Sequence, residues 1–150
     1  MKAELQSPVG RLTLSAADGA ITALGWGRLD ASDTAPVFDQ ASAELAAYFA
    51  GDLTQFSVPL APGGSAFQRK FYAALCAIPH GQTRRYGDLA ADLGVSAQAI
   101  GQACGANPIP IFIPCHRVLG SDGLGGYSGA GGVETKVALL KLEGAASLLI

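Results

Sequence analysis

The sequence is poor in cysteine, in net charge and in long apolar runs. Only three of its 150 residues are cysteine, and none forms a Cys-x-x-Cys pair. Neither a disulfide framework nor a zinc site is expected, and a reduced, cytoplasmic chain is favoured. A formal charge of −2 argues against nonspecific binding to nucleic acid through phosphates alone. No apolar run is long enough to cross a bilayer and no signal-peptide core is present, so no membrane partner is expected.

The first third of the sequence predicts a β-rich subdomain with one helix. Residues 11–15 alternate polar and apolar side chains, and Asp18 and Gly19 are typical of a hairpin turn before a return strand over residues 20–26. A helix over residues 38–50 follows. This part carries no cluster of reactive side chains, so we interpret it as a support.

A stretch rich in proline and glycine over residues 56–64 indicates a boundary. We expect an N-terminal subdomain over residues 1–60 and a mostly helical domain over residues 61–150, which together make an α/β protein of the α+β kind. The second part begins with a helix whose capping box is Ser65 and Gln68.

That helix is expected to end at Pro79 and to carry Cys76 and His80 one turn apart. Two such groups do not make a metal site. We interpret them as an interior thiol and an imidazole at a helix end.

Two short helices are predicted over residues 86–93 and 97–105, with Gly94 as the break and Ser96 as the second cap. This is the pattern of a helix-turn-helix. The second helix is rich in alanine and glycine. It can approach a narrow groove closely, whereas readers of the major groove carry long polar side chains; alternatively, small residues only allow tight helix packing.

Residues 107–118 form an apolar segment punctuated by three prolines, which fix φ and remove backbone donors. The segment delivers Cys115, His116 and Arg117. A cysteine in an apolar run is often a buried structural residue, but a neighbouring imidazole and guanidinium lower the pKa of a thiol and indicate a positioned nucleophile. Because adjacent side chains of an extended chain face opposite ways, His116 needs a sharp turn or a bridging water to reach Cys115.

Residues 119–132 are glycine-rich but lack the end of a P-loop, so they either wall a pocket or form a surface loop. The last helix, over residues 133–142, is expected to turn Val137 and Leu140 inward. Glu143 then follows at the helix end that disfavours a carboxylate. It is expected either to pair with the imidazole beside the thiol or to be a solvated surface residue.

Several blocks resemble one family in content and order. The run Pro114-Cys115-His116-Arg117-Val118, preceded by Asn107, is similar to the active-site signature of the O6-alkylguanine-DNA alkyltransferases, or methylated-DNA–protein-cysteine methyltransferases. Other similar blocks lie at residues 7–10, 66–68, 78–81, 86–90, 127–129 and 139–144. The resemblance covers essentially the whole chain. It implies a monomeric suicide repair protein with a ribonuclease H-like N-terminal part, which binds alkylated DNA in the minor groove without a cofactor or metal.

In that family the damaged guanine is flipped out of the duplex, because its O6 atom is out of reach inside the stack. The resemblance implies that Cys115 accepts the alkyl group, that His116 acts on the thiol through a water, and that Glu143 orients the imidazole. Tyr86 would hydrogen-bond guanine N3 and help to rotate the nucleotide. The expected lesion is O6-alkylguanine, with O4-alkylthymine as a second candidate.

Other family positions imply contacts rather than chemistry. Backbone groups of Cys115, Val118 and Ser128 would read the guanine edge. Asn107 would tie the helix-turn-helix to the active-site turn, and Arg117 would hold the motif by hydrogen bonds.

One position departs from the family. The recognition helix usually begins with an arginine finger, whereas this sequence has Gln98 there. Glutamine is shorter and uncharged, so we expect slower repair of duplex DNA with the thiol chemistry intact. Ala99, Gly101 and Arg84 would also contact DNA, and compensation by Arg84 or Arg85 is left open.

Two other functions remain as alternatives. The first is a non-catalytic binder of alkylated DNA, like the alkyltransferase-like proteins, which replace the reactive cysteine. The second is a Cys/His hydrolase whose oxyanion hole is supplied by the glycine-rich loop.

Overall fold

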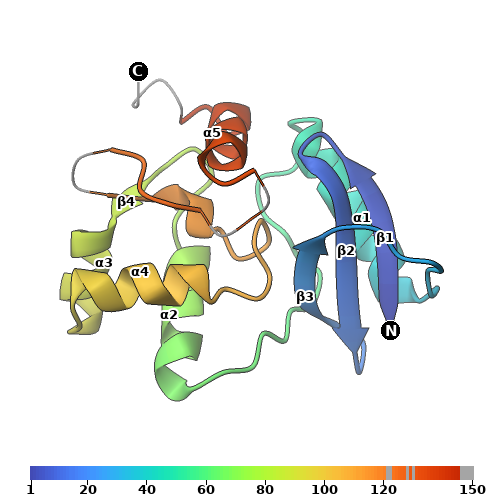
Figure 1. Ribbon diagram of the computed structural model, residues 1–150, viewed down its shortest axis with the longest axis horizontal. Helices are drawn as coiled ribbons and strands as arrows, with labels where there is room; N and C mark the ends of the chain where they lie inside the picture. Colours follow the sequence, from blue (N-terminus) through green and yellow to red (C-terminus); the bar gives the residue numbers. More distant parts are fainter. Residues whose placement is uncertain (121–122, 128, 130, 146–150) are drawn as a thin grey trace. The chain divides into compact units, whose positions relative to one another are not determined.

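The structure is a computed structural model, and it describes residues 1–120, 123–127, 129 and 131–145. A small antiparallel sheet and five α-helices in the described residues confirm the α+β class. The chain divides into two units, Met1–Gly63 and Gly64–Ile150. Figure 1 shows the order of the elements along the chain.

The first unit begins with strands β1 (Lys2–Ser7), β2 (Gly10–Ala17) and β3 (Ala20–Trp26), which form an antiparallel sheet in the order β1-β2-β3. Leu12 and Leu14 on β2 are fully buried, as the alternation of side chains in this strand predicts. The sequence therefore places one face of this sheet against a core.

The predicted hairpin turn between β2 and β3 is confirmed. Asp18 and Gly19 have φ values of 52° and 77°, and positive φ at both central residues matches the right-handed twist of the flanking strands. Helix α1 (Pro36–Phe49) starts two residues before the predicted position, since proline is favoured in the first turn of a helix. Its side chains Phe38 and Leu45 are buried.

The second unit begins with α2 (Ala66–Cys76), whose predicted capping box is present. Ser65 Oγ accepts from the backbone N–H of Gln68 at 3.1 Å, and the Gln68 side chain accepts from the backbone N–H of Ser65 at 2.8 Å. The helix ends at Cys76, earlier than expected. His80 therefore lies beyond the helix, and the expectation of one turn between the two residues is wrong, because the chain turns before Pro79. The interpretation of Cys76 as an interior thiol is also wrong, since the residue is exposed.

Helices α3 (Tyr86–Leu93) and α4 (Ala97–Gly105) have the predicted limits. Gly94 takes the left-handed conformation that ends α3, and the side chain of Ser96 accepts from the backbone N–H of Ala99 at 3.0 Å to begin α4. The two helices pack together. The predicted helix-helix pair is thus confirmed.

Two short strands that sequence periodicity does not indicate join distant parts of the second unit. β4 (Arg84–Arg85) pairs in parallel with β5 (Val118–Leu119), which follows the 3-10 turn η1 (Cys115–Arg117). Because α3 starts directly after β4, this pairing brings Tyr86 toward the turn that carries Cys115.

Helix α5 (Val133–Leu142) has the predicted limits, but its inward face differs from the prediction. Val137 is only partly buried, and the side chains that are buried are Thr135, Lys136, Leu139 and Leu140. A lysine can occupy the inner face here because backbone carbonyls satisfy its ammonium group. Within the described residues, none of the helices combines the length and apolar character needed to cross a bilayer.

Candidate active site

The apolar segment before Cys115 is almost wholly buried and is shaped by one side chain. Asn107 Nδ2 donates to the carbonyl of Ile113 at 2.9 Å, and Asn107 Oδ1 accepts from the backbone N–H of Ile109 at 3.0 Å. Ile111 lies at φ 74°, a left-handed conformation that is rare for a β-branched residue. Strain of this kind persists only where the surroundings over-determine the backbone.

The chain turns sharply immediately before the nucleophile candidate. Pro114 has φ −81° and ψ 66°, and the backbone N–H of Cys115 donates to the carbonyl of Ile113 at 2.8 Å. These are the angles and the bond of an inverse γ-turn. The following residues form η1, so the extended geometry assumed from the sequence gives way to the sharp turn that was the stated alternative.

The two residues after Cys115, His116 and Arg117, form a buried cluster with Glu143. His116 Nε2 lies 2.7 Å from Glu143 Oε2. Arg117 donates to both carboxylate oxygens of Glu143, at 2.8 and 3.0 Å, and to the carbonyl of Ile78 at 2.7 Å. Glu143 is only 5% exposed. The expected pairing of Glu143 with the imidazole is present, and the alternative of a solvated surface residue is wrong.

The bidentate arginine decides the protonation of this cluster. A carboxylate held by a guanidinium stays ionised and can only accept hydrogen bonds. His116 Nε2 must therefore carry a proton toward Glu143. Burial lowers the pKa of His116, although the carboxylate of Glu143 opposes that shift. The ring is neutral near pH 7, which leaves Nδ1 as an unprotonated acceptor.

That acceptor atom has no hydrogen-bond partner among the described residues, although it is buried. An orphaned buried polar atom is uncommon in a folded protein. Here it belongs to a ring whose other nitrogen is fixed by a carboxylate. The arrangement is that of a base oriented by a second group.

Cys115 lies at a pocket of about 370 Å³ in the second unit. Tyr86, Gly101, Cys104, Gly105, Cys115, Gly126 and Tyr127 line it. The volume falls within the range of small-molecule sites. Gly126 and Tyr127 belong to the glycine-rich segment, so that segment forms a pocket wall, as one of its two interpretations predicted.

Tyr86 is held close to this wall. A Cβ added at Gly125, which has φ 69°, would come within 2.9 Å of the Tyr86 hydroxyl. Only glycine fits there without displacing the ring. Burial raises the pKa of Tyr86, with smaller contributions from the Cys104 and Cys115 thiols, so its hydroxyl is a neutral donor at pH 7.

Lys136 is a central member of the site that the sequence did not reveal. It is fully buried, and its ammonium group donates to the carbonyls of Val118 (2.7 Å), Gly126 (3.0 Å) and Leu124. It also lies 5.9 Å from the centre of the Tyr86 ring. One cation thus ties β5 to the pocket wall. The available signal was its position seven residues before Glu143, on the same helical face.

The residues expected to contact DNA are distributed differently from the catalytic candidates. Gln98 is exposed, Ala99 and Gly101 are half-buried, and all three lie on α4. A Cβ at Gly101 would meet no described atom within 4 Å. Tight helix packing therefore does not explain this glycine, which favours the open-face interpretation of α4.

Arg84, which was expected to contact DNA, makes an ion pair with Asp92 at 2.8 Å. The side chain of Val118 is fully buried, so only its backbone could reach a base. Its N–H donates to the Cys115 carbonyl, and its own carbonyl accepts from Lys136. Ser128 lies outside the described residues.

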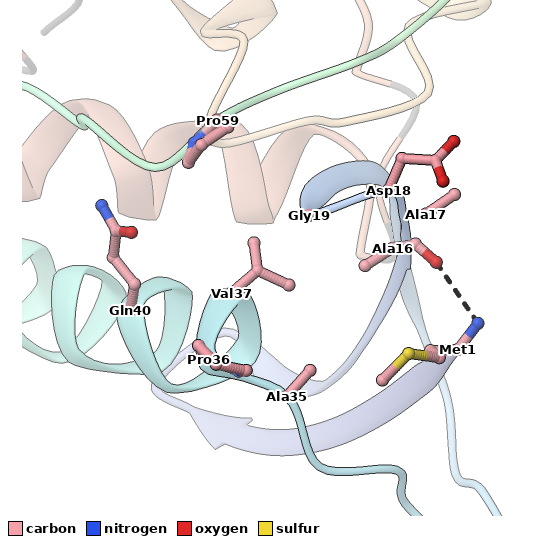
Figure 2. A pocket seen from close by; sticks show the side chains of 10 residues that line it. All are labelled: Met1, Ala16, Ala17, Asp18, Gly19, Ala35, Pro36, Val37, Gln40 and Pro59. Atoms are coloured by element: carbon pink, nitrogen blue, oxygen red, sulfur yellow. Dashed lines mark hydrogen bonds between the residues drawn. The ribbon is translucent and has the colours of Figure 1, made fainter.

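The first unit holds a different kind of pocket, of about 410 Å³ (Figure 2). Most of the lining side chains are small or apolar, and they come from Met1, the end of β2, the β2–β3 turn and the start of α1. The N-terminal ammonium donates to the Ala16 carbonyl at 3.2 Å. It contains no paired reactive groups. Across the described residues, no three His, Cys, Asp or Glu side chains converge as a metal site would require.

Two family models match the chain. The 6-O-methylguanine DNA methyltransferase, DNA binding domain, matches residues 66–145, and the ribonuclease-like domain of the same family matches residues 1–62. A methylated-DNA–protein-cysteine methyltransferase of Mycolicibacterium paratuberculosis is 43% identical over 93% of this chain and 89% of its own length. One of Methanosarcina acetivorans is 50% identical over 71% and 69%, respectively.

A solved structure of a relative is also similar to this chain in three dimensions. Mycobacterium tuberculosis OGT, crystallised in complex with DNA, is similar with a TM-score of 0.84 and 41% identity, over 97% of this chain and 93% of that one. Fold and site thus define an α+β protein whose second unit holds both a helix-turn-helix and a buried Cys-His-Glu set. The chain belongs to the 6-O-methylguanine DNA methyltransferase family.

Proposed function

We propose that this protein repairs DNA by transferring the alkyl group of O6-alkylguanine irreversibly to Cys115. The sulfur–carbon bond forms as the carbon–O6 bond breaks, and the released electron pair returns to the purine, which takes up a proton. The protein is consumed once, because nothing in this step regenerates the thiol. Family membership and the names of its relatives, which are methylated-DNA–protein-cysteine methyltransferases, support this activity.

The observation that carries the proposal is the buried set of hydrogen bonds that begins at His116, the residue after Cys115. Glu143, fixed by Arg117, holds Nε2 of His116, and this leaves Nδ1 as a neutral acceptor with no partner among the described residues. In the proposal, a water connects Nδ1 to Cys115 and carries the thiol proton away, as a general base must do before a thiol can attack. Tyr86, a neutral donor at the same pocket, would bind guanine N3.

The lesion reaches the pocket by leaving the duplex. The O6 atom cannot be attacked inside a stacked helix, and the pocket of about 370 Å³ is built from one face of α4 and the glycine-rich wall. We place α4 in the minor groove, where its small side chains permit a close approach. A relative crystallised with DNA supports DNA as the partner. A monomer in the cytoplasm remains a prediction from the sequence.

Gln98 is proposed to weaken repair of duplex DNA. It is exposed near the start of α4, where the family usually has an arginine finger that fills the gap left by the flipped base. Its amide can hydrogen-bond the orphaned partner base but fills less space and adds no charge. Chemistry at Cys115 would be unaffected, because Gln98 does not line the pocket.

The deciding experiment is intact mass after incubation with an oligonucleotide that contains O6-methylguanine. A stable gain of one methyl group, mapped to Cys115 and lost in Cys115→Ser, is the expected result. Binding with unchanged mass would favour the non-catalytic lesion binder. Multiple turnovers with no stable adduct would favour the Cys/His hydrolase.

The role of Gln98 is tested by Gln98→Arg. We expect faster transfer from duplex DNA and an unchanged rate with free O6-benzylguanine. Equal changes with both substrates would contradict the proposal, since an effect on the free base cannot come from filling a gap in a duplex.

A further inference from the structure

A second thiol lines the pocket that holds Cys115. Cys104 lies on α4, is buried, and faces this pocket together with Gly101 and Gly105. Cys104 and Gly105 each follow Gly101 by about one turn, so the three residues lie on one side of the helix. Among the three, the thiol of Cys104 is the largest group, so it marks how far this wall extends into the pocket.

The two glycines near Cys104 leave open space next to α4 that no described atom fills. A Cβ on Gly101 or Gly105 would meet no described heavy atom within 4 Å. A cavity of about 150 Å³ holds one benzene ring, whereas this pocket measures about 370 Å³. It can therefore take the two fused rings of a purine together with a substituent larger than a methyl group.

Cys104 is poorly suited to accept an alkyl group itself. Burial raises its pKa to about 12, the charge of Cys115 acts in the same direction, and Lys136 opposes them. The thiolate is the nucleophilic form of cysteine, so Cys104 stays a neutral thiol near pH 7. Its contribution to the pocket is then its size and its apolar surface.

We propose that Cys104 sets the upper size of the O6 substituent that this protein accepts. The inference rests on the proposed function, because it assigns a substrate range to the same pocket. It makes Cys104 a specificity-determining residue, separate from the residues that carry the proton or the alkyl group.

The test compares transfer from O6-methylguanine and O6-benzylguanine in the same single-stranded oligonucleotide, so that base flipping does not enter. Cys104→Leu should lower the benzyl-to-methyl rate ratio by about tenfold or more, the range expected when a pocket loses room for an apolar group. Gly101→Ala should lower it in the same direction by a smaller factor. Cys104→Ser keeps the size of the side chain and should leave the ratio within about twofold of wild type.

Gly101→Ala also guards against a folding defect, because the added methyl group meets no described atom and alanine favours a helix. Cys76→Ser, outside the pocket, is the matched control and should not change the ratio. An unchanged ratio in both Cys104→Leu and Gly101→Ala, with methyl transfer intact, would overturn the inference and leave the proposed function standing.

Two other results separate the possibilities. A fall in the ratio for Cys104→Ser as large as that for Cys104→Leu would assign the effect to thiol chemistry and overturn the size argument. Alkyl groups found on Cys104 by peptide mapping would do the same. Wild-type protein that takes no methyl group at all would instead count against the proposed function itself.

Discussion

The two units differ in what they bury. In the first unit the buried side chains are apolar or aromatic, led by Leu12, Leu14 and Tyr48. In the described part of the second unit, by contrast, six polar or charged side chains are buried: Asn107, His116, Arg117, Thr135, Lys136 and Glu143. A buried polar group costs free energy unless it is hydrogen-bonded. The second unit meets this cost with the contacts that position Cys115 and the pocket wall.

Backbone strain shows the same contrast. Among the described residues, only Asp18 and Ile111 combine a side chain with positive φ. Asp18 is exposed in a hairpin turn, where aspartate tolerates that conformation. Ile111 is β-branched, buried and four residues before Cys115. The comparison teaches that the first unit follows local rules, whereas the second departs from them near its site.

The largest expected effect sharpens the contrast between two carboxylates. Glu143→Gln removes the partner of a buried arginine and should lower the free energy of unfolding by about 3–5 kcal/mol. Glu44→Gln in the first unit removes a carboxylate that accepts from the backbone N–H groups of Ser57 and Val58 near the surface, and should cost at most about 1 kcal/mol. Denaturant unfolding measures both; equal losses would break the comparison.

Lys136 and Lys141 form a matched pair on α5. Lys136→Met leaves buried carbonyls without a donor and should cost about 3 kcal/mol, with slower alkyl transfer because the pocket wall loses its tie. Lys141 is exposed, so Lys141→Met should change stability by no more than about 0.5 kcal/mol. Thermal or denaturant unfolding, together with the transfer rate, tests the pair. A wild-type rate for Lys136→Met would remove Lys136 from the site.

Ile111 and Ile109 are buried to the same degree but differ in backbone strain. Glycine at either position loses the side chain, yet only Ile111→Gly also relieves a left-handed conformation. Ile111→Gly should therefore be less destabilising than Ile109→Gly by about 1–3 kcal/mol. If unfolding experiments give the opposite order, Ile111 is not strained and the contrast with Asp18 disappears.

The buried imidazole of His116 makes the second unit sensitive to acid, and the first unit contains no histidine. The lowered pKa of His116 means that the unfolded chain takes up a proton first as pH falls through 6.5. Stability is therefore lost between pH 6.5 and the lower folded pKa. Transfer from free O6-benzylguanine should fall about tenfold per pH unit below that folded pKa. His80→Gln should keep this pH profile. If the pH dependence disappears in that variant, the titrating group is not His116.

The smallest effect concerns surface charge. Asp92→Asn releases Arg84 from its ion pair, so DNA affinity should rise by a few-fold and the slope of log affinity against log salt should steepen by up to about 0.9, the value for one phosphate contact. Glu4→Gln breaks the half-buried ion pair with Arg11 in the first unit at 3.7 Å and should change neither. Salt titrations of binding to an oligonucleotide decide between them; an effect of Glu4→Gln alone would reverse the comparison.

The local elements of this protein could be predicted because their signals lie within a few residues. The hairpin at Asp18, the capping box at Ser65 and the break at Gly94 depend on φ preferences and on side chains that satisfy nearby backbone groups. The limits of α3, α4 and α5 follow from such signals. Glu143 is a carboxylate at the helix end that the dipole disfavours, and the pairing with His116 that this position suggested is present.

Other features were decided only when distant segments met. The parallel pairing of β4 with β5, the burial of Lys136 and the exposure of Cys104 to the pocket each join residues more than ten positions apart. No local preference predicts these contacts. A lysine is normally a surface residue, and here it is buried only because three backbone carbonyls take the place of water around its ammonium group. The sequence by itself determined the reactive groups and the elements that carry them. The pocket that these groups share, and the burial of Lys136 against its wall, came from tertiary packing. Burial creates hydrogen-bond requirements that only the assembled fold can meet.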